Sequence, residues 1–330
     1  MRSFIRAYPT ETRLFAVLLA ISAYLSFASP SFLTFGNIAS LLNNNAVNVI
    51  WAVGLLVVLI AGGIDISFAV AASVVQYLCA YVFSAIGGGN WLIGFVVAGG
   101  IGAAIGFINA GLIHYFRIIS IVVTIASFNA LFGLLMFLTS GRSLYDLPDW
   151  WTNRIVVFQM QTADGRGAEL ILPVAVMVSA IAVTWILIRY MTTGRQLYAF
   201  GDNPDGAQRA GVSAASMRFI AFGWMGMMAG VGGLMQTNIV QEVVPNALIG
   251  RELDVLAAVV LGGARLGGGR GSVAGCFLGV LLVAITQNGL NLLGVSPFAF
   301  KMVIGVIILF AISMSNLDFE KLSEAARGSR

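Results

Sequence analysis

The arrangement of this chain is set by residues 189–218, which read RYMTTGRQLYAFGDNPDGAQRAGVSAASMR. This polar segment holds four arginines and two aspartates, with a Gly-Asp-Asn-Pro turn at its centre (residues 201–204). It separates two long apolar runs in a sequence that is apolar nearly everywhere else. Because charged side chains are costly inside a lipid bilayer, a polar interval of this length has to lie in water on one side of a membrane.

The composition assigns the chain to the membrane proteins. It has 330 residues, of which 59% are hydrophobic and only 10% are charged, whereas soluble domains carry about 25% charged residues. Apolar stretches near twenty residues recur from end to end, and about twenty helical residues cross the roughly 30 Å hydrocarbon layer. We therefore predict an all-α, polytopic membrane protein of about ten transmembrane helices, which excludes an ordinary soluble enzyme.

The apolar runs place the spans along the sequence. A polar, asparagine-rich stretch (residues 34–48) precedes the second span, and a longer loop (residues 140–167) follows the fifth. The Trp150-Trp151 pair in that loop is typical of an anchor at the membrane interface. One apolar run, residues 255–261, is too short to cross alone. The long spans are predicted at residues 14–28, 49–61, 64–86, 91–113, 118–138, 170–188, 219–235, 273–293 and 298–313.

The basic residues orient the chain. With the N-terminus inside and about ten crossings, thirteen of the 18 lysines and arginines lie on the inner side and the other five on the outer side. Cytoplasmic loops of membrane proteins carry such an excess of basic residues. Both termini are therefore predicted to be cytoplasmic, together with the polar segment and a polar C-terminal tail (residues 315–330). This distribution also explains the net charge of +4 without a nucleic-acid partner.

The short apolar run predicts a broken helix around residues 254–271. Eleven helical residues rise about 16 Å, which is roughly half the hydrocarbon thickness. Irregular backbone is tolerated at that depth only where protein or a water-filled cavity covers it, and acidic residues at its start favour a helix N-terminus. We expect this short helix and the glycine turn after it to pack near a central pathway. Its motif residues are Glu252, Asp254, Gly262, Gly263, Gly269 and Gly271.

Residues 62–67, GGIDIS, predict a second helix break. The two glycines relax the backbone, and Asp65 or Ser67 can accept hydrogen bonds from the first free amides of the next helix. Two interpretations stay open for this turn. It is either a structural cap or a position that lines or gates a pathway.

Several kinds of chemistry are disfavoured by the sequence. Ionisable residues are nearly absent from the spans, whereas proton- and ion-driven carriers need such residues as relays. Neither of the two lysines, Lys301 and Lys321, follows a glycine-rich phosphate loop. His114 is the single histidine and has no second ligand close by in the sequence, and both cysteines, Cys79 and Cys276, lie in apolar runs. We expect no metal, no cofactor and no catalysis on this chain.

Three blocks, in order along the chain, resemble one family. They read VLIAGGIDIS at residues 58–67, GDNPDGAQRAGV at residues 201–212, and ELDVLAAVVLGG with GGRGSV within residues 252–273. Together with FGN at residues 35–37 they cover nearly the whole chain. They are similar to the membrane subunits of bacterial ABC importers for ribose and related sugars. The chain departs from the family pattern at Phe68-Ala69, in the register of Gln208-Arg209, at Ala264-Arg265 and at Cys276.

The resemblance implies a single permease domain over residues 1–330, located in the bacterial inner membrane. Its partners would be ABC ATPase subunits in the cytoplasm, a periplasmic solute-binding protein and a second permease subunit, identical or paralogous. Lipid would surround the complex, and no nucleic acid is implied. The solute would be a sugar or sugar-like polyol, which ATP hydrolysis on the separate ATPase drives into the cytoplasm.

Within the polar segment, the resemblance implies an ATPase-coupling loop. Asn203-Pro204 begins a turn, and residues 205–212 can form a short amphipathic helix that would fit a groove on the ATPase. A solvated loop without a partner is the alternative. The coupling residues are expected to be Gly201, Asn203, Asp205, Ala207, Arg209, Gly211 and Val212.

The polar residues within the spans have two possible roles. They either line a hydroxyl-rich pathway or bridge helices. They comprise Asn43, Asn44, Asn45, Asn48, Gln76, Asn109, Asn129, Gln236, Gln287, Asn288 and Asn291. The predicted gate or pathway residues are Gly62, Gly63, Asp65, Ser67, Asn109, Gln287 and Asn288.

A function of another class is also consistent with a small-residue core and about ten spans. The chain would then be an ATP-independent secondary carrier or facilitator for a small polar solute. A membrane-embedded enzyme is disfavoured, because no cluster of acid, base and nucleophile stands out in the sequence.

Overall fold

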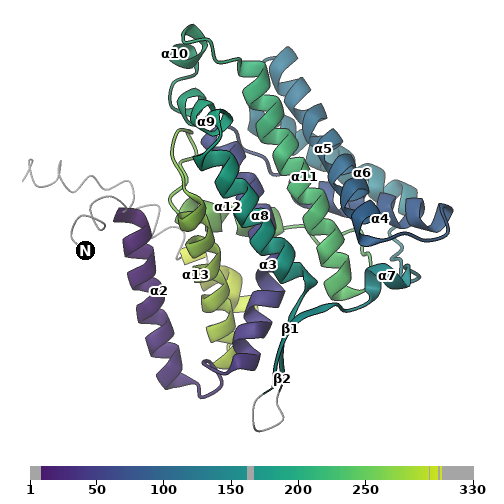
Figure 1. The fold of residues 1–330 in the computed structure, drawn as a ribbon, viewed down its shortest axis with the longest axis vertical. Coiled ribbons are helices and arrows are strands. Elements are labelled where there is room, and N and C mark those ends of the chain that lie inside the picture. The colour runs from purple at the N-terminus through teal and green to yellow at the C-terminus, as the bar shows by residue number, and fades with distance from the viewer. Residues whose placement is uncertain (1–8, 162–166, 297, 304, 307–330) are drawn as a thin grey trace, which may run out of the picture.

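A computed structural model describes residues 9–161, 167–296, 298–303 and 305–306. The long helices stand side by side as a bundle, and most of the short helices and a two-stranded hairpin lie toward its ends (Figure 1). The long helices are α2 (Pro9–Ala28), α3 (Phe35–Ile60), α4 (Phe68–Ala85), α5 (Trp91–Tyr115), α6 (Ser120–Thr139), α8 (Leu172–Arg189), α11 (Ala214–Val240) and α13 (Val273–Leu292). The short elements are α7 (Asp149–Thr152), α9 (Thr192–Asp202), α10 (Pro204–Arg209), α12 (Arg251–Leu261), β1 (Val156–Gln161) and β2 (Gly167–Ile171).

The described part of the chain contains 8 helices that are long and apolar enough to cross a membrane. They correspond one by one to the first eight long spans that the apolar runs predict, so the all-α polytopic class is confirmed. Residues 298–303 are helical, but most of the predicted last span lies outside the described residues. The C-terminal tail and residues 1–8 lie outside them too, and the side on which the termini lie stays a prediction.

The predicted start of the second span, at residue 49, is wrong. Helix α3 begins at Phe35 and takes in the whole asparagine-rich stretch. Asn43 is buried there because both polar atoms of its side chain have a partner: its Nδ2 donates to the carbonyl oxygen of Glu169 at 2.8 Å, and its Oδ1 accepts from the amide of Ile171 at 3.2 Å. A polar side chain with such partners does not interrupt a buried helix.

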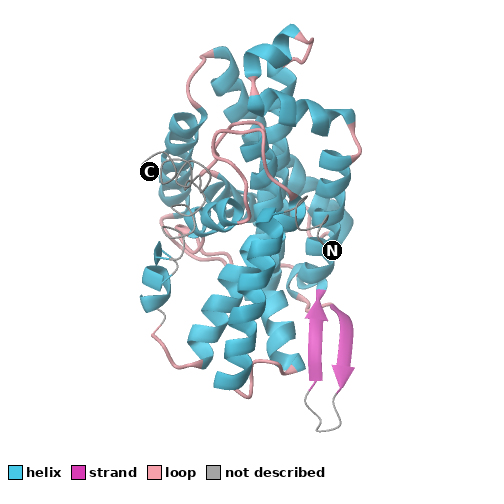
Figure 2. Cartoon of the chain, turned by 90° about the vertical axis from the view of Figure 1, so that its left-hand side faces the viewer, coloured by secondary structure: helices cyan, strands magenta, loops and turns pink. Residues whose placement is uncertain are grey.

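The predicted interfacial role of the tryptophan pair is wrong for Trp151 and stays a prediction for Trp150, which is half-buried. Trp151 is completely buried, and its Nε1 donates to the carbonyl oxygen of Leu234 at 2.9 Å. Trp150 stacks on it with a ring separation of 6.1 Å. The same loop continues into the antiparallel β1–β2 hairpin, which pairs Val156 with Ile171 and Gln161 with Gly167. This hairpin projects from the end of the bundle opposite α9 and α10 (Figure 1, Figure 2).

The polar segment is mostly helical and is not a simple loop. It folds into α9 and α10, which stand at one end of the bundle (Figure 1). The short helix predicted at residues 205–212 is shorter, since α10 ends at Arg209 and a turn follows. The chain needs that turn to return into the bundle at α11.

Helix α3 is the central element of the bundle. It contacts α8, α11, α12 and α13, and all of its residues from Val49 to Ile60 are buried. Trp51, on the same helix, donates from its Nε1 to the carbonyl oxygen of Ala229 at 3.4 Å. Helix α2, by contrast, lies at the edge of the bundle and packs on α13 (Figure 1).

Glycines bring α5 and α11 into backbone contact. A Cβ atom on Gly102 would overlap the carbonyl oxygen of Gly226, and a Cβ atom on Gly226 would overlap that of Gly102. The same overlap occurs between Gly106 and the carbonyl oxygen of Phe222. Small residues at such positions let membrane helices approach closely, so this helix pair depends on the absence of side chains.

We predict that Gly102→Val destabilises the protein whereas Gly100→Val does not. Gly100 lies two residues away on the same helix, is exposed, and has no atom within 4 Å of a Cβ position. Overpacking a close contact costs about 1–3 kcal/mol, so the thermal unfolding midpoint of the detergent-solubilised protein should fall by several degrees for Gly102→Val only. Equal midpoints for the two variants would contradict the backbone contact.

Candidate functional site

Four glycines from three distant segments meet at the end of the bundle that carries α9 and α10. We call this cluster, Gly62, Gly201, Gly268 and Gly269, the glycine junction. A Cβ atom on Gly201 would overlap the carbonyl oxygen of Ile60 and lie 2.7 Å from the amide nitrogen of Gly269. A Cβ atom on Gly268 would lie 2.8 Å from the Cα atom of Gly62. Gly201 and Gly268 therefore leave no room for a side chain.

The backbone conformation gives a second reason for these glycines. Gly62, Gly268 and Gly269 have φ values of +80°, +88° and +73°, a region that other L-residues rarely adopt. The amide of Gly269 donates to the carbonyl oxygen of Ile60 at 2.9 Å, which satisfies a free carbonyl at the end of α3. The loop after α12 is therefore hydrogen-bonded to the end of α3.

Tyr198 makes a second link between α9 and the loop that follows α12. Its hydroxyl donates to the carbonyl oxygen of Gly271 at 2.6 Å. Burial raises the pKa of the Tyr198 phenol, and the charge of Arg189 acts in the opposite direction. The hydroxyl therefore stays protonated and able to donate at neutral pH.

Helix α10 is exposed at the tip of this end of the molecule (Figure 1). Asn203 caps it, since its Oδ1 accepts from the amide of Gly206 at 2.9 Å. Ala207 is buried and anchors the helix, while Asp205 and Arg209 are exposed. The helix is thus fixed to the bundle and still presents charged and small side chains to the cytoplasmic side predicted above.

The turn after α10 also depends on a glycine. Gly211 has φ of +88° and is exposed, with no atom within 4 Å of a Cβ position. The next residue, Val212, donates its amide to the carbonyl oxygen of Ala207 at 3.0 Å and closes the turn. All seven predicted coupling residues therefore lie in one compact unit formed by the end of α9, α10 and this turn.

The second helix break is a hydrogen-bonded turn. Asp65 Oδ1 accepts from the amide of Ser67 at 2.8 Å and from its hydroxyl at 2.7 Å. Ser67 precedes α4 but its side chain makes no capping bond, so Asp65 closes the turn ahead of the helix instead of capping it. Gly63 is buried and its amide donates to the carbonyl oxygen of Val58 at 3.0 Å.

The turn is tied to two further helices. Asn109 on α5 donates from its Nδ2 to Ser67 Oγ at 3.0 Å, and Ser127 on α6 donates to Asn109 Oδ1 at 2.5 Å. Asp65, Ser67 and Asn109 are each at most 2% exposed. The structure therefore brings these three predicted pathway residues together, in contacts that bridge helices.

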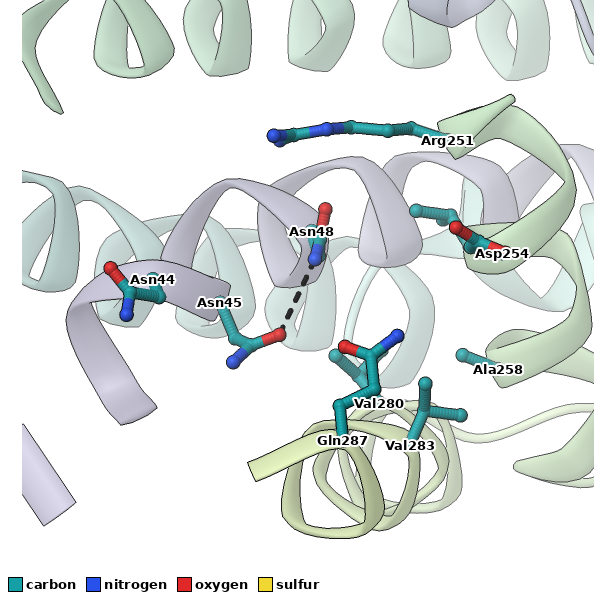
Figure 3. Close-up of a pocket in the computed structure, with 10 residues that line it drawn as sticks. Asn44, Asn45, Asn48, Arg251, Asp254, Ala258, Val280, Val283 and Gln287 are labelled. Carbon is teal, nitrogen blue, oxygen red and sulfur yellow. Dashed lines mark hydrogen bonds between the residues drawn. The ribbon is translucent and has the colours of Figure 1, made fainter. Parts of the chain in front are cut away.

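A polar cavity lies between α3, α12 and α13 (Figure 3). Its volume is about 260 Å³, far more than the roughly 10–15 Å³ that one water molecule needs. We call it the α12 pocket. Most of its polar lining is neutral amide, and the charged residues come from the start of α12. The lining consists of Asn44, Asn45, Asn48, Arg251, Asp254, Val255, Ala258, Val280, Val283 and Gln287.

Gln287 and Asn288, both predicted pathway residues, have different positions. Gln287 lines the α12 pocket, whereas Asn288 pairs with Asn37 through two amide hydrogen bonds of 3.0 and 2.9 Å. Gln76 likewise bridges helices, donating to Thr237 Oγ1 at 2.9 Å. The structure thus divides the intramembrane amides into a bridging group and a pocket group.

The α12 pocket lies at about half the depth of the bundle. Helix α12 packs antiparallel on α13, since Gly262 meets Gly275 at its end and Ala258 meets Gly279 one turn earlier. Arg251, at the start of α12, is therefore about 16 Å from the glycine turn, at 1.5 Å per residue. The predicted broken helix is present, although it begins at Arg251 instead of residue 254.

The other broken-helix residues have structural contacts. Glu252 is buried, and both of its carboxylate oxygens accept from the amide of Gly250, at 3.1 and 2.9 Å. Gly263 and Gly271 have φ values of +89° and +152°, so they shape the turn between α12 and α13. Sequence reasoning missed Arg251 as a pocket residue, because an arginine beside a polar stretch looks like part of a loop.

The sequence of this chain is similar to those of known transport proteins. Residues 37–312 match the family model described as "Branched-chain amino acid transport system / permease component". The ribose import permease protein RbsC of Escherichia coli K12 is 31% identical, over 96% of this chain and 96% of its own. RbsC of Bacillus subtilis is 34% identical over 90% of each chain, and the galactose/methyl galactoside import permease protein MglC of E. coli K12 is 24% identical over 97% and 98%. No solved structure gives a significant match to the chain.

We predict that Gly201→Ala loosens the glycine junction. Its Cβ atom would overlap the carbonyl oxygen of Ile60, which accepts the Gly269 hydrogen bond. An amide that loses such a hydrogen bond exchanges its proton with solvent faster, because a smaller local opening of the structure is enough to expose it. Hydrogen exchange in residues 262–271 should therefore be at least about tenfold faster, as measured by mass spectrometry.

The matched control is Gly133→Ala on α6, where a Cβ atom meets nothing within 4 Å. Exchange in residues 262–271 should be unchanged in that variant. A folded Gly201→Ala protein with unchanged exchange would show that the junction does not hold the loop.

Proposed function

The chain belongs to the family of permease components that the family model describes, and from this premise we propose that it is the membrane subunit of an ATP-driven importer for a sugar or sugar-like polyol. It is a multi-pass protein of the inner membrane, and its relatives are permease components of sugar importers. The family description and the relatives' names refer to different solutes, so support for a sugar comes from the relatives and from the amide-lined pocket.

The observation that carries the proposal is the continuous backbone connection from α10 to the α12 pocket. Helix α10 continues from α9, whose end at Gly201 contacts the loop at Gly268 and Gly269. That loop follows directly on the end of α12, and α12 lines the pocket. A displacement of α10 would therefore reach the pocket through packed backbone. Rigid elements that shift together are a common way to switch a cavity between two sides.

We place ATP hydrolysis on a separate subunit that docks on α10. The chain's two lysines, Lys301 and Lys321, do not follow a glycine-rich phosphate loop. The exposed side chains of α10 are those of Pro204, Asp205, Gln208 and Arg209, and Gly211 leaves open space beside the helix. A partner surface can approach the helix closely there. No cofactor on this chain is part of the proposal.

The remaining partners follow from the same type of importer. We propose one permease domain over residues 1–330, a second permease subunit that is identical or paralogous, and a periplasmic solute-binding protein. The β1–β2 hairpin and the loop at α7 lie at the end of the bundle opposite α10 (Figure 1). This is the face to which a solute-binding protein would deliver its solute.

Reconstitution into liposomes separates this function from an ATP-independent carrier. Liposomes that contain the permease, its cognate ATPase and its binding protein should take up labelled solute only when ATP is supplied on the side of the membrane that carries the ATPase. D-ribose and D-galactose would be screened first. Permease alone should give no sustained uptake. Sustained uptake by the permease alone would instead identify a secondary carrier or facilitator.

Substitution of Gly211 tests the docking of the ATPase. Gly211→Asp should reduce copurification of the ATPase and ATP-driven uptake at least about tenfold, because a charged side chain would fill the open space beside α10. Gly87→Asp is the matched control: Gly87 also has a positive φ (+71°) and open space around its Cβ position, but it lies in the turn between α4 and α5.

Both variants should insert into the membrane normally. Because both glycines have a positive φ, the comparison between the two variants controls for the effect of backbone strain. Copurification that is lost equally in both variants, or retained in Gly211→Asp, would argue against docking at α10.

A further inference from the structure

Two oppositely charged residues line the α12 pocket together. Arg251 and Asp254 lie three residues apart in the first turn of α12, on the face of the helix that borders the cavity (Figure 3). Both are half-buried, and the polar side chains around them are the neutral amides of Asn44, Asn45, Asn48 and Gln287. Residues three apart on a helix are neighbours on its surface, so a solute in the pocket would meet both charges.

The guanidinium of Arg251 is not neutralised by a direct ion pair. Its Nη1 donates to Gln236 Oε1 at 3.0 Å. Among the described residues, no carboxylate oxygen lies within 4.0 Å of its nitrogens. A guanidinium has five N–H donors, so most of them are left for water or a solute. Figure 3 shows the side chain extended from the start of α12 along the upper side of the cavity.

Glu252 and Lys301 balance the charge around the pocket without entering it. Glu252 is not among the residues that line the cavity, and its carboxylate is held by the amide of Gly250. A Cβ atom on Gly250 would lie 3.6 Å from Lys301 Nζ, so this ammonium group is close to the start of α12. The four charges, from Arg251, Glu252, Asp254 and Lys301, sum to zero. Charged side chains at membrane depth are costly and mark functional positions.

This arrangement suits a neutral, hydroxyl-rich solute. Amide side chains donate and accept hydrogen bonds, Arg251 only donates, and ionised Asp254 only accepts. A hydroxyl group both donates and accepts, so a neutral polyhydroxylated molecule can pair with every side of the pocket. An anion that pairs with Arg251 also meets the repulsion of Asp254, and a cation that pairs with Asp254 also meets the repulsion of Arg251, so the pair gives neither ion a net attraction. An ion that enters the pocket therefore loses hydration without full compensation, whereas a neutral solute does not carry that cost.

We propose that Arg251 and Asp254 form a charge-balanced selectivity pair, by which the permease itself discriminates against ionised solutes and admits neutral hydroxyl-rich ones. This inference rests on the proposed function, since it takes the α12 pocket to be part of the transport route. It assigns to the permease a second selection step, in addition to selection by a solute-binding protein.

The test uses a single cysteine as a reporter of charge in the pocket. Cys79 and Cys276 are both buried, and they are replaced by alanine. Gln287→Cys then places one thiol in the pocket lining. The full-length protein in detergent is reacted with two thiosulfonate reagents of similar size, one carrying a sulfonate and one a trimethylammonium group. The measured quantity is the ratio of the anion rate to the cation rate.

With both charged residues present, the two rates should agree within about threefold. Arg251→Gln should lower the anion-to-cation ratio about tenfold, and Asp254→Asn should raise it about tenfold. Arg251→Lys keeps the charge and should keep the ratio. Arg265→Gln removes an exposed arginine at the other end of α12, outside the pocket lining, and should leave the ratio unchanged.

Three outcomes would overturn the proposal. They are a ratio that neither neutralising substitution changes, a ratio that Arg265→Gln shifts as much as Arg251→Gln does, and a thiol at position 287 that reacts with neither reagent. Because the ratio is taken within one protein sample, a fall in both rates through misfolding would not imitate the expected shift. The assay needs no ATPase and no known solute, so its result is independent of whether uptake proves to be ATP-driven.

Discussion

The hydrogen bond from the Gly269 amide to the Ile60 carbonyl is the contact on which the end of the bundle that carries α9 and α10 depends. It forms only because Gly201 and Gly268 bring no side chain between the three backbones that meet there. The end of the central helix, the end of α9 and the loop after α12 are thereby packed as one unit. Tyr198 adds a second bond between α9 and the same loop. The position of α12, and with it the shape of the α12 pocket, is set from this junction.

Two groups of intramembrane polar residues follow from the same packing. Those that find a partner on another segment, such as Asn43, Asn109 and Asn288, are fully used in holding the bundle together. Those that face the half-length helix α12, such as Asn44 and Gln287, have no opposing helix to fill the space beside them and so border a cavity. A helix that stops at half depth creates the pocket, because the neighbouring helices continue past its end. The turn at Asp65 belongs to the first group, which favours its structural interpretation over a gate.

Much of the fold could be predicted from the sequence because apolar length and arginine position depend on the bilayer and not on tertiary contacts. The described spans and the short helix at α12 follow from these signals alone. The early start of α3 could not be predicted, because Asn43 is tolerated only through its bonds to backbone near β2, more than a hundred residues away. The buried position of Trp151 depends in the same way on the carbonyl of Leu234. Arg251 was missed because its role depends on which face of a half-length helix borders the cavity, and sequence periodicity over three turns does not show that.

The central claim is that α10 and α12 move as one unit when ATP binds. Pairs of spin labels in the assembled importer would measure this, with one pair at exposed positions Gln208 and Leu253, on α10 and α12, and another at Leu253 and Ile108, on α12 and α5. We predict that ATP leaves the distance from Gln208 to Leu253 unchanged within about 2 Å and changes the distance from Leu253 to Ile108 by several Å. A displacement of Gln208 while the distance from Leu253 to Ile108 stays constant would contradict the account.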